Sequence, residues 1–357
     1  MIVLPKVAVA MSGGVDSSVA AALLVAEGYP VIGIMLRLWS EPGAENENRC
    51  CTPDAMAQAR RVAAQLGIQF YAIDARQRFH DTVVQTFLSG YVQGLTPNPC
   101  VVCNRLIRWG LLLDTALAMG AEKMATGHYA RLRTLEDGTV QLLKGIDPRK
   151  DQSYILSSLS QDQLNHALLP LGEYQKSQVR ELARNFGLPV AERSESQDLC
   201  FLAGQDYRQF LGRHAPEALK PGPIVDRRGS ILGEHRGLAF YTVGQRKGIG
   251  IAFPEPLYVL NKDMHTNTLV VGPVSELGQD TLQAHHVNWT SGSVPQGPFP
   301  ADVKIRYKAE LARATIFPLE GDQARLVFEH PMRDITPGQL VVFYNNEMVV
   351  GGGLIAR

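Results

Sequence analysis

The stretch that most constrains the fold is Met11–Ser18 (MSGGVDSS), which lies between an apolar run, Lys6–Ala10, and an apolar helical pattern, Val19–Ala26. A strand, a glycine turn and a helix start therefore follow one another directly. The two glycines allow positive φ angles and a close approach of the backbone to a ligand. Successive N–H groups in such a turn, together with the positive end of the following helix, favour anions. The alternative is a strand followed by a helix that Asp16 or Ser17 merely caps.

Alternating strand and helix patterns fill the first part of the chain. The predicted strands are Val7–Met11, Val31–Leu36, Phe70–Asp74 and Lys123–Thr126. The predicted helices are Ser18–Glu27, Asp54–Leu66, Phe79–Tyr91 and Leu106–Met119. This alternation predicts an α/β fold with a parallel sheet that is covered by helices on both faces. Ligands bind such sheets outside the carboxyl ends of the strands. We therefore expect Leu36 and Gly127 to approach the same nucleotide as the glycine loop.

Composition places limits on the function. The 357 residues predict about two or three domains, and the 35 basic residues balance the 35 acidic ones. A nucleic-acid partner must therefore be recognised by local basic segments. We find neither a secretion signal nor an apolar run that could span a bilayer, and we expect a cytoplasmic protein without a membrane partner. In a reducing compartment, five cysteines point to reactive or metal-binding thiols.

The cysteines fall into three groups. Cys100 and Cys103 lie in TPNPCVVCNR, where Asn104 is predicted to cap the following helix and to place Cys103 at its N-terminus, which favours the thiolate. Cys200 follows a polar loop, SESQDLCF. A zinc site that adds Cys50 and Cys51 is disfavoured by their adjacency, and we interpret both as structural or incidental. An iron–sulfur cluster held by Cys100, Cys103 and Cys200 is an open alternative.

The chain after Gly204 is rich in glycine, proline and short β-like runs. Strands are predicted at Asp302–Tyr307, Ala312–Phe317, Gln323–Phe328 and Gln339–Tyr344, and their spacing suggests a small barrel. We expect three domains: an α/β domain over residues 1–203, a central β-rich domain over 204–280, and a C-terminal β-barrel over 281–357.

Three segments in this order, SGGVDSS, NPCVVCNR and SQDLCFL, make the chain similar to the tRNA-specific 2-thiouridylases. The first alone resembles the pyrophosphate loop of the ATP pyrophosphatase superfamily, whose members transfer AMP from ATP. The lysine of a Walker A loop is absent. The similarity extends through KDQSY, TVGQRKG and Arg306-Tyr307. It implies that residues 1–203 form a catalytic domain like the adenine nucleotide α-hydrolases, that the central domain contacts tRNA, and that ATP is the activating substrate.

The resemblance implies roles for individual residues. Cys103 would be the nucleophile, and Cys200 would carry a persulfide from a donor protein, either a cysteine desulfurase or a relay. The family has Asp or Cys at the position of Cys100, so its role here is left open. The expected ATP-binding residues are Ala10, Met11, Ser12, Gly13, Gly14, Val15, Asp16, Ser17, Leu36 and Gly127. The expected tRNA-binding residues are Asn98, Pro99, Cys100, His128, Lys150, Asp151, Gln152, Arg306, Tyr307 and Gln339. No resident protein-held metal is expected, and Mg²⁺ would accompany ATP.

The implied reaction is 2-thiolation of the wobble uridine of tRNA of the Lys, Glu and Gln type. The C2 oxygen would attack the α-phosphate of ATP, and pyrophosphate would leave into the glycine loop. Sulfur from Cys200 would then replace the oxygen, and a Cys103–Cys200 disulfide would form. We expect a monomer. Two other readings are a ligase of the same superfamily that acts on a small metabolite, and a non-catalytic RNA-binding protein.

Overall fold

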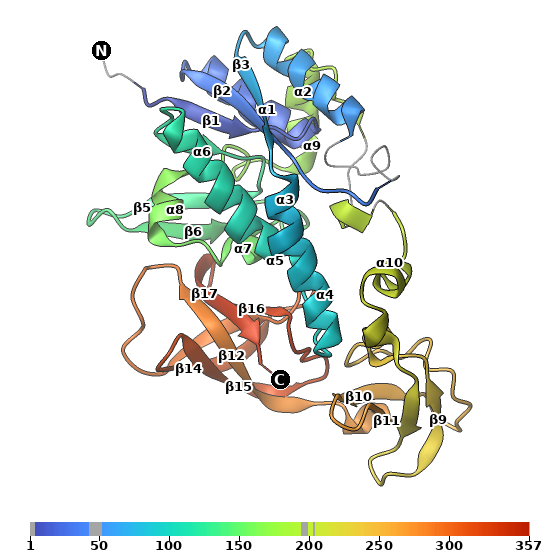
Figure 1. Ribbon diagram of the computed structural model, residues 1–357. Helices are drawn as coiled ribbons and strands as arrows, with labels where there is room; N and C mark the ends of the chain where they lie inside the picture. The colour runs from blue at the N-terminus through green and yellow to red at the C-terminus, as the bar shows by residue number, and fades with distance from the viewer. Residues whose placement is uncertain (1–3, 43–51, 194–198, 203, 357) are drawn as a thin grey trace.

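The structure is a computed structural model that describes residues 4–42, 52–193, 199–202 and 204–356. Cys50, Cys51 and the polar residues that lead to Cys200, 194–198, lie outside the described residues. Figure 1 shows a parallel-sheet unit at the N-terminus, a small separate sheet, and a C-terminal barrel. Among the described residues, no helix combines the length and the apolar character that crossing a membrane requires.

The first unit is built on a five-stranded parallel sheet of order β3-β2-β1-β4-β7. Its strands are β1 (Val7–Ala10), β2 (Val31–Arg37), β3 (Gln69–Asp74), β4 (Lys123–Ala125) and β7 (Ala167–Leu168). The four predicted strands are confirmed, each with one end shifted by a residue. Val7 and Val9 face one core, whereas Ala8 faces the other. Side chains of a strand alternate between its faces, so both faces of this sheet are covered.

Helices cover the sheet on both sides (Figure 1). In the N-terminal half they are α1 (Val15–Ala26), α2 (Pro53–Gln65), α3 (Arg76–Phe79), η1 (His80–Val84), α4 (Gln85–Val92), α5 (Pro99–Val102), η2 (Cys103–Leu112) and α6 (Leu113–Ala118). They continue with α7 (Ser153–Leu156), α8 (Gln161–His166), α9 (Lys176–Asn185) and η3 (Cys200–Leu202). The next helices, α10 (Tyr207–His214) and η4 (Pro216–Leu219), lie on the connection to the central unit (Figure 1).

Three predicted helix starts were wrong, for local reasons. Helix α1 begins at Val15, with Gly14 as its N-cap, so Asp16 and Ser17 lie in the first turn and neither caps it. The predicted helix Phe79–Tyr91 is part of a run that begins at Arg76 and contains the π-helical segment η1. The predicted helix Leu106–Met119 is the later part of a run, α5-η2-α6, that begins at Pro99. π-Helical turns depart from the 3.6-residue period on which the predictions were based.

The C-terminal unit is a closed antiparallel barrel of order β12-β15-β14-β13-β16-β17, which the pairing of β12 with β17 completes. Its strands are β12 (Gln279–Trp289), β13 (Phe299–Lys304), β14 (Ala312–Leu319), β15 (Gln323–Met332), β16 (Leu340–Asn345) and β17 (Met348–Ile355). The predicted barrel is confirmed. The predicted strand Asp302–Tyr307 was placed too late, because β13 ends at Lys304 and leaves Arg306 and Tyr307 in the following turn.

A hairpin of the first unit, β5 (Ala130–Thr134) and β6 (Val140–Lys144), extends the sheet of the barrel through β17. The Nη2 atom of Arg131 lies 2.9 Å from the Glu347 carboxylate, and the backbone N–H of Lys144 donates to the Glu347 carbonyl. The catalytic unit and the barrel are therefore joined by a shared sheet, although the sequence predicts two separate domains.

The central unit is a small four-stranded sheet of order β10-β11-β8-β9, set apart from the rest of the molecule in Figure 1. Its elements are β8 (Gly222–Val225), β9 (Ile231–His235), η5 (Leu238–Phe240), β10 (Tyr258–Asp263), β11 (Thr268–Gly272) and η6 (Val274–Glu276). A compact apolar core that includes Ile224, Leu238 and Val259 holds it together.

Candidate active site

The glycine loop joins the end of β1 to the start of α1, as the sequence predicts. Gly13 has a φ of 70°, and a Cβ atom there would lie 2.2 Å from the carbonyl oxygen of Ala55, so only glycine fits. The Oγ atom of Ser17 accepts a hydrogen bond from the backbone N–H of Ser12 and lies 3.1 Å from the Oγ atom of Ser12. Ser18 is fully buried and donates to the carbonyl of Gly14. The hydroxyls thus fix the loop, and the N–H groups of the first turn of α1 stay available to an anion.

Two distant side chains converge on Asp16 in the first turn of α1. The Nζ atom of Lys176 lies 2.6 Å from Oδ1 of Asp16, and the hydroxyl of Tyr129 donates to the same oxygen at 2.8 Å. Lys176 is the first residue of α9 and is largely buried. An ammonium group therefore lies beside the loop although no lysine occurs in the loop sequence.

Arg193 is a second basic side chain at the loop. Its Nη1 atom donates to the carbonyl of Gly13 at 3.1 Å, and its Nη2 atom lies 3.1 Å from the carboxylate of Asp54. Sequence reasoning missed Lys176, Tyr129 and Arg193 as site residues. They lie more than a hundred residues from the loop in the sequence, and no motif spacing connects them to it.

Gly127 lies against the glycine loop. A Cβ atom on Gly127 would lie 2.8 Å from both the carbonyl carbon of Asp16 and the nitrogen of Ser17, so a larger residue would displace the loop. Leu36 is buried near the end of β2, the neighbour of β1. The expected convergence at the carboxyl ends of the strands is thus present for both the loop and Gly127.

The segment with the two nearby cysteines begins at an Asn–Pro pair. The side chain of Asn98 accepts a hydrogen bond from the backbone N–H of Cys100 and caps the helical run, with Pro99 in its first position. The predicted cap was wrong: the side chain of Asn104 lies inside the helix and donates to the carbonyl of Cys100. Cys103 therefore lies beyond the first turn, where the effect of the helix dipole is weaker.

The three described cysteines differ in exposure. Cys100 is exposed, Cys103 is buried at 8% exposure, and Cys200, in η3, is partly buried. Cys103 belongs to a large apolar core, and Cys200 packs against the same core. Within the described residues, no three His, Cys, Asp or Glu side chains are placed to hold a metal ion.

The segment that bears Cys200 is anchored by Phe201 and, further along the chain, by α10. Phe201 packs edge-on against Phe79, Phe87 and Phe210. In α10, Arg213 donates two hydrogen bonds to the carboxylate of Glu41, which lies after β2. Bonding from Arg213 holds the pKa of Glu41 below its usual range.

His128 is buried and has contacts at both ring nitrogens. Its Nδ1 lies 2.7 Å from Oγ1 of Thr126, and its Nε2 lies 3.3 Å from Nη1 of Arg108. A guanidinium can only donate, so Nε2 accepts and the proton lies on Nδ1. Burial, reinforced by the charge of Arg108, lowers the pKa of His128 to about 3. The imidazole is therefore neutral and holds the guanidinium of Arg108, which belongs to the same helix η2 as Cys103.

The other residues expected to bind tRNA are spread over the molecule, and several have internal partners. The buried carboxylate of Asp151 accepts from Gly145 N–H, Ser153 N–H and Ser153 Oγ. The side-chain oxygen of Gln152 accepts from the backbone of Tyr129. Lys150 is partly exposed.

The barrel supplies the rest of this set. Arg306 donates to the carbonyls of Val243 and Asp334, and Gln339 donates to the carbonyl of Thr96 at 2.6 Å. Tyr307 is 37% exposed. Tyr307 is thus the barrel residue of this set whose ring is open to solvent.

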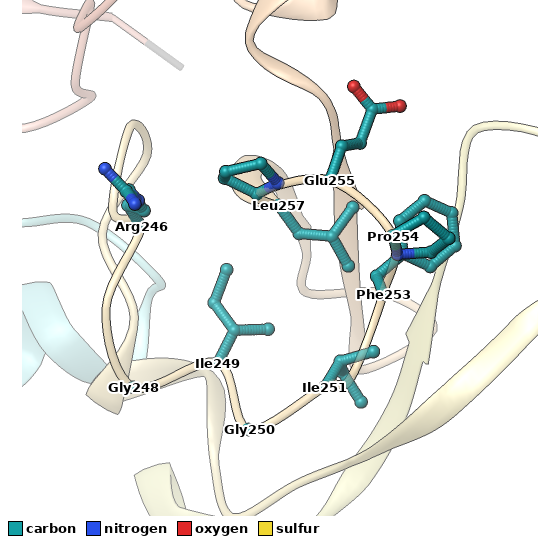
Figure 2. A pocket seen from close by; sticks show the side chains of 10 residues that line it. Arg246, Gly248, Ile249, Gly250, Ile251, Phe253, Pro254, Glu255 and Leu257 are labelled. Carbon is teal, nitrogen blue, oxygen red and sulfur yellow. The ribbon is translucent and has the colours of Figure 1, made fainter.

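The central unit has a cavity of about 390 Å³, which is lined in part by Arg246, Gly248 and Gly250. Figure 2 shows Arg246 on one side, Ile249 and Leu257 between, and Phe253 with Glu255 on the far side. A second cavity of about 500 Å³ is lined by Arg78, Arg105, Ser158 and Asn288 among others, and lies between helix η2 and the barrel. Both provide basic and apolar groups of the kind that single-stranded RNA contacts.

Comparison with known proteins connects these features. Residues 5–204 match the family described as "tRNA methyl transferase HUP domain", residues 208–273 its "PRC-barrel domain", and residues 279–355 the "aminomethyltransferase beta-barrel domain". The chain is 50% identical over 352 residues to the tRNA-specific 2-thiouridylase of Magnetococcus marinus, which covers 98% of both chains. It is 49% identical over 350 residues to that of Moorella thermoacetica, with 97% and 98% covered. The chain belongs to the tRNA-specific 2-thiouridylase family. The family descriptions mention methyl transfer, but the full-length identity decides in favour of the thiouridylases.

Solved structures resemble the chain only over part of its length. An NMN synthetase from Francisella tularensis aligns with 59% of this chain and with 73% of its own chain, at 21% identity and a TM-score of 0.35. A 4-thiouridine synthetase in complex with RNA and ATP aligns with 60% of this chain and with 51% of its own chain, at 14% identity and a TM-score of 0.34. Likenesses this distant have no bearing on the activity.

Proposed function

We propose that this chain catalyses the ATP-dependent 2-thiolation of the wobble uridine in tRNA of the Lys, Glu and Gln type, and releases AMP and pyrophosphate. The observation that carries the proposal is the combination, in one α/β unit, of a phosphate-binding glycine loop and two cysteines in contact with one core. A ligase acting on a small metabolite needs the loop but has no use for the two thiols.

The glycine loop serves the activation step. The C2 oxygen of the uridine attacks the α-phosphate of ATP, and pyrophosphate leaves toward the N–H groups at the start of α1. Lys176 lies beside this position and balances the added charge, and Arg193 fixes the carbonyl of Gly13. The loop residues fit ATP. Mg²⁺ would accompany the phosphates, because Oδ1 of Asp16 is already bonded by Lys176 and Tyr129. It would neutralise phosphate charge there.

The thiols serve the sulfur step. Cys200 receives a terminal sulfur from a donor protein, a cysteine desulfurase or a relay, and holds it as a persulfide. The thiolate of Cys103 attacks the inner sulfur, which releases hydrosulfide and leaves a Cys103–Cys200 disulfide. Hydrosulfide attacks C2 of the adenylated uridine and AMP leaves with the former C2 oxygen. A thiol reductant then returns both cysteines to their starting state.

The RNA contacts named by residue lie in the catalytic unit and in the barrel, and the central unit would contact the tRNA as well, with unit boundaries proposed at residues 203 and 280. Asn98, Pro99 and Cys100 lie at the start of the helix that bears Cys103 and would line the pocket for the unstacked uridine. Lys150, Arg306 and Tyr307 would contact the tRNA outside this pocket. His128 would act through Arg108. We further propose that the protein is a monomer and lies in the cytoplasm, a compartment in which thiols stay reduced.

The test uses the purified full chain, unmodified tRNA, ATP and a persulfide donor as the sole source of sulfur. We expect mass spectrometry of tRNA nucleosides to detect 2-thiouridine, with AMP release that requires tRNA. Cys200→Ser should abolish thiolation and AMP release but retain tRNA-dependent release of pyrophosphate, because adenylation of the uridine precedes the sulfur step. Thiolation by Cys200→Ser at the wild-type rate would refute the persulfide role, and AMP release that ignores tRNA would favour the small-molecule ligase.

A further inference from the structure

The segment that leads into the helix of Cys103 is held by both other units of the molecule. This segment, Gly94–Asn98, follows α4 and precedes α5. A Cβ atom on Gly94 would lie 2.3 Å from Sδ of Met264, a residue of the central unit. Two residues later, Thr96 donates its backbone N–H to the carbonyl of Pro337 at 2.9 Å. The central unit and the barrel thus meet the catalytic unit at one short stretch of backbone.

The barrel bonds both backbone groups of Thr96, its N–H and its carbonyl. Besides the bond from its N–H, its carbonyl accepts from Nε2 of Gln339 at 2.6 Å. Gly338, with a φ of 87°, lies against the same backbone: a Cβ atom there would lie 2.9 Å from Cβ of Leu95 and 3.1 Å from the nitrogen of Thr96. The backbone of Gln339 is fixed within the barrel by bonds with Thr336 and Ile355, so only its side chain extends to the catalytic unit.

The path from Thr96 to the helix of Cys103 is stiff. Pro97 and Pro99 have fixed φ angles, and the residues before them, Thr96 and Asn98, are restricted to extended conformations. A displacement at Thr96 is therefore passed on to Asn98. Asn98 caps the helical run that contains Cys100 and Cys103. Loss of the cap geometry would shift or fray the turn that precedes Cys103.

We propose that the barrel loop 334–339 positions the nucleophile, with Gln339 and Gly338 as positioning residues that hold Thr96 and, through it, the start of the Cys103 helix. The inference rests on the proposed role of Cys103. It gives Gln339 a function other than direct contact with RNA. The same loop also binds Arg306, whose Nη2 atom donates to the carbonyl of Asp334 and to Oγ1 of Thr336. RNA bound beside Arg306 and the geometry at Cys103 are thereby coupled through one loop.

Two variants test the proposal, each with a matched control. Gln339→Ala removes the bond to Thr96, and Gln323→Ala removes an exposed glutamine at the start of β15. Gly338→Ala introduces the overlap with Leu95 and Thr96. Gly321→Ala places alanine at a similar positive φ of 70°, where the nearest atom is 3.9 Å away. Both controls lie in the barrel, outside the loop and the proposed site.

The readouts separate positioning from RNA contact. We measure tRNA affinity, the single-turnover thiolation rate at saturating tRNA with Cys200 already persulfidated, and the alkylation rate of Cys103 without tRNA, resolved by peptide mass spectrometry. We expect Gln339→Ala and Gly338→Ala to lower the saturated rate on the order of tenfold and to change the alkylation rate, since small misplacements of reacting groups are costly. Affinity should change less than about twofold, because no base or phosphate contact is removed. The controls should match the wild type.

The result that would overturn the proposal is weaker tRNA binding by Gln339→Ala with unchanged saturated rate and Cys103 alkylation, which would make Gln339 an RNA contact. If Gly338→Ala fails to fold, Gln339→Ala alone decides. A different variant, Cys103→Ser, shows whether the proposed function itself is wrong. Cys103→Ser would then thiolate at the wild-type rate, while the alkylation test on Gln339→Ala would still report whether the loop positions the helix.

Discussion

His128 makes the stability of the catalytic unit dependent on pH. Its ring is buried between Thr126 and Arg108, and its pKa falls from 6.5 to about 3, first because of burial and then because of the nearby guanidinium. In the unfolded chain the imidazole regains its ordinary pKa. Between these two values the unfolded state binds more protons than the folded state, so stability is fully present above the unfolded pKa and is lost as the pH falls.

The size of the effect follows from the two pKa values. Each pH unit below the unfolded pKa costs about 1.4 kcal/mol, so lowering the pH from about 7 to about 5 removes about 2 kcal/mol of unfolding free energy through this residue. His128→Gln keeps a neutral polar side chain but cannot take up a proton. We therefore expect the variant to lose less stability over this range than the wild type does, by that amount.

The assay is urea unfolding of wild type and His128→Gln at both pH values, followed by circular dichroism. His166→Gln, at a partly exposed histidine of α8, is the control and should behave like the wild type. Equal pH-dependent losses in wild type and His128→Gln would refute the reasoning, because they would mean that the ring is not held neutral by its surroundings.

Three further predictions concern the loop and the junction of the units. Lys176→Met should slow tRNA-dependent AMP release by about 100-fold, as expected when one charge-stabilising donor is lost, with tRNA affinity unchanged in a filter-binding assay. Gly127→Ala should lower the same rate by at least about tenfold, because its Cβ overlaps the backbone of the loop, whereas Gly212→Ala in α10, with its nearest neighbour at 3.7 Å, should not. Tyr154→Phe removes a buried hydroxyl bonded to the carbonyl of Leu340 and should lower the free energy of unfolding by about 1–3 kcal/mol in urea titrations at constant pH.

Local sequence patterns predicted the elements that depend on near neighbours. The strands of the parallel sheet alternate apolar residues that face two cores, and the glycine loop has its turn residues in sequence. The helix starts were less accessible. Asn98 and Asn104 are both plausible caps next to cysteines, and the choice of Asn104 was wrong because the run Pro99–Val102 is helical in the structure. Pro99 at the first helical position was the signal for the earlier start.

Residues that act across long sequence separations were not predictable from one sequence. Lys176 opens an ordinary amphipathic helix, and only the folded chain brings its ammonium to Asp16. Gln339 is expected to bind RNA because of a resemblance, and the contact of its side chain with Thr96 is visible only in the structure. No periodicity or spacing encodes such a pair, because the geometry that joins them is set by the packing of whole units.

The way the units are joined limits which parts can move during the reaction. The β5–β6 hairpin pairs with the barrel through β17, and the side chain of Asn288 in β12 donates to the carbonyls of Ser157 and Leu159. These bonds fix the barrel against the catalytic unit, so a rigid rotation of the barrel would break the shared sheet. The Cys200 segment is tied differently, through the aromatic contacts of Phe201 and the Glu41–Arg213 pair at α10. Apolar contacts and the bonds to one carboxylate are easier to rearrange than a paired sheet. Any motion that brings Cys200 to Cys103 is therefore expected in the Cys200 segment, with the barrel and the Cys103 helix as the fixed side.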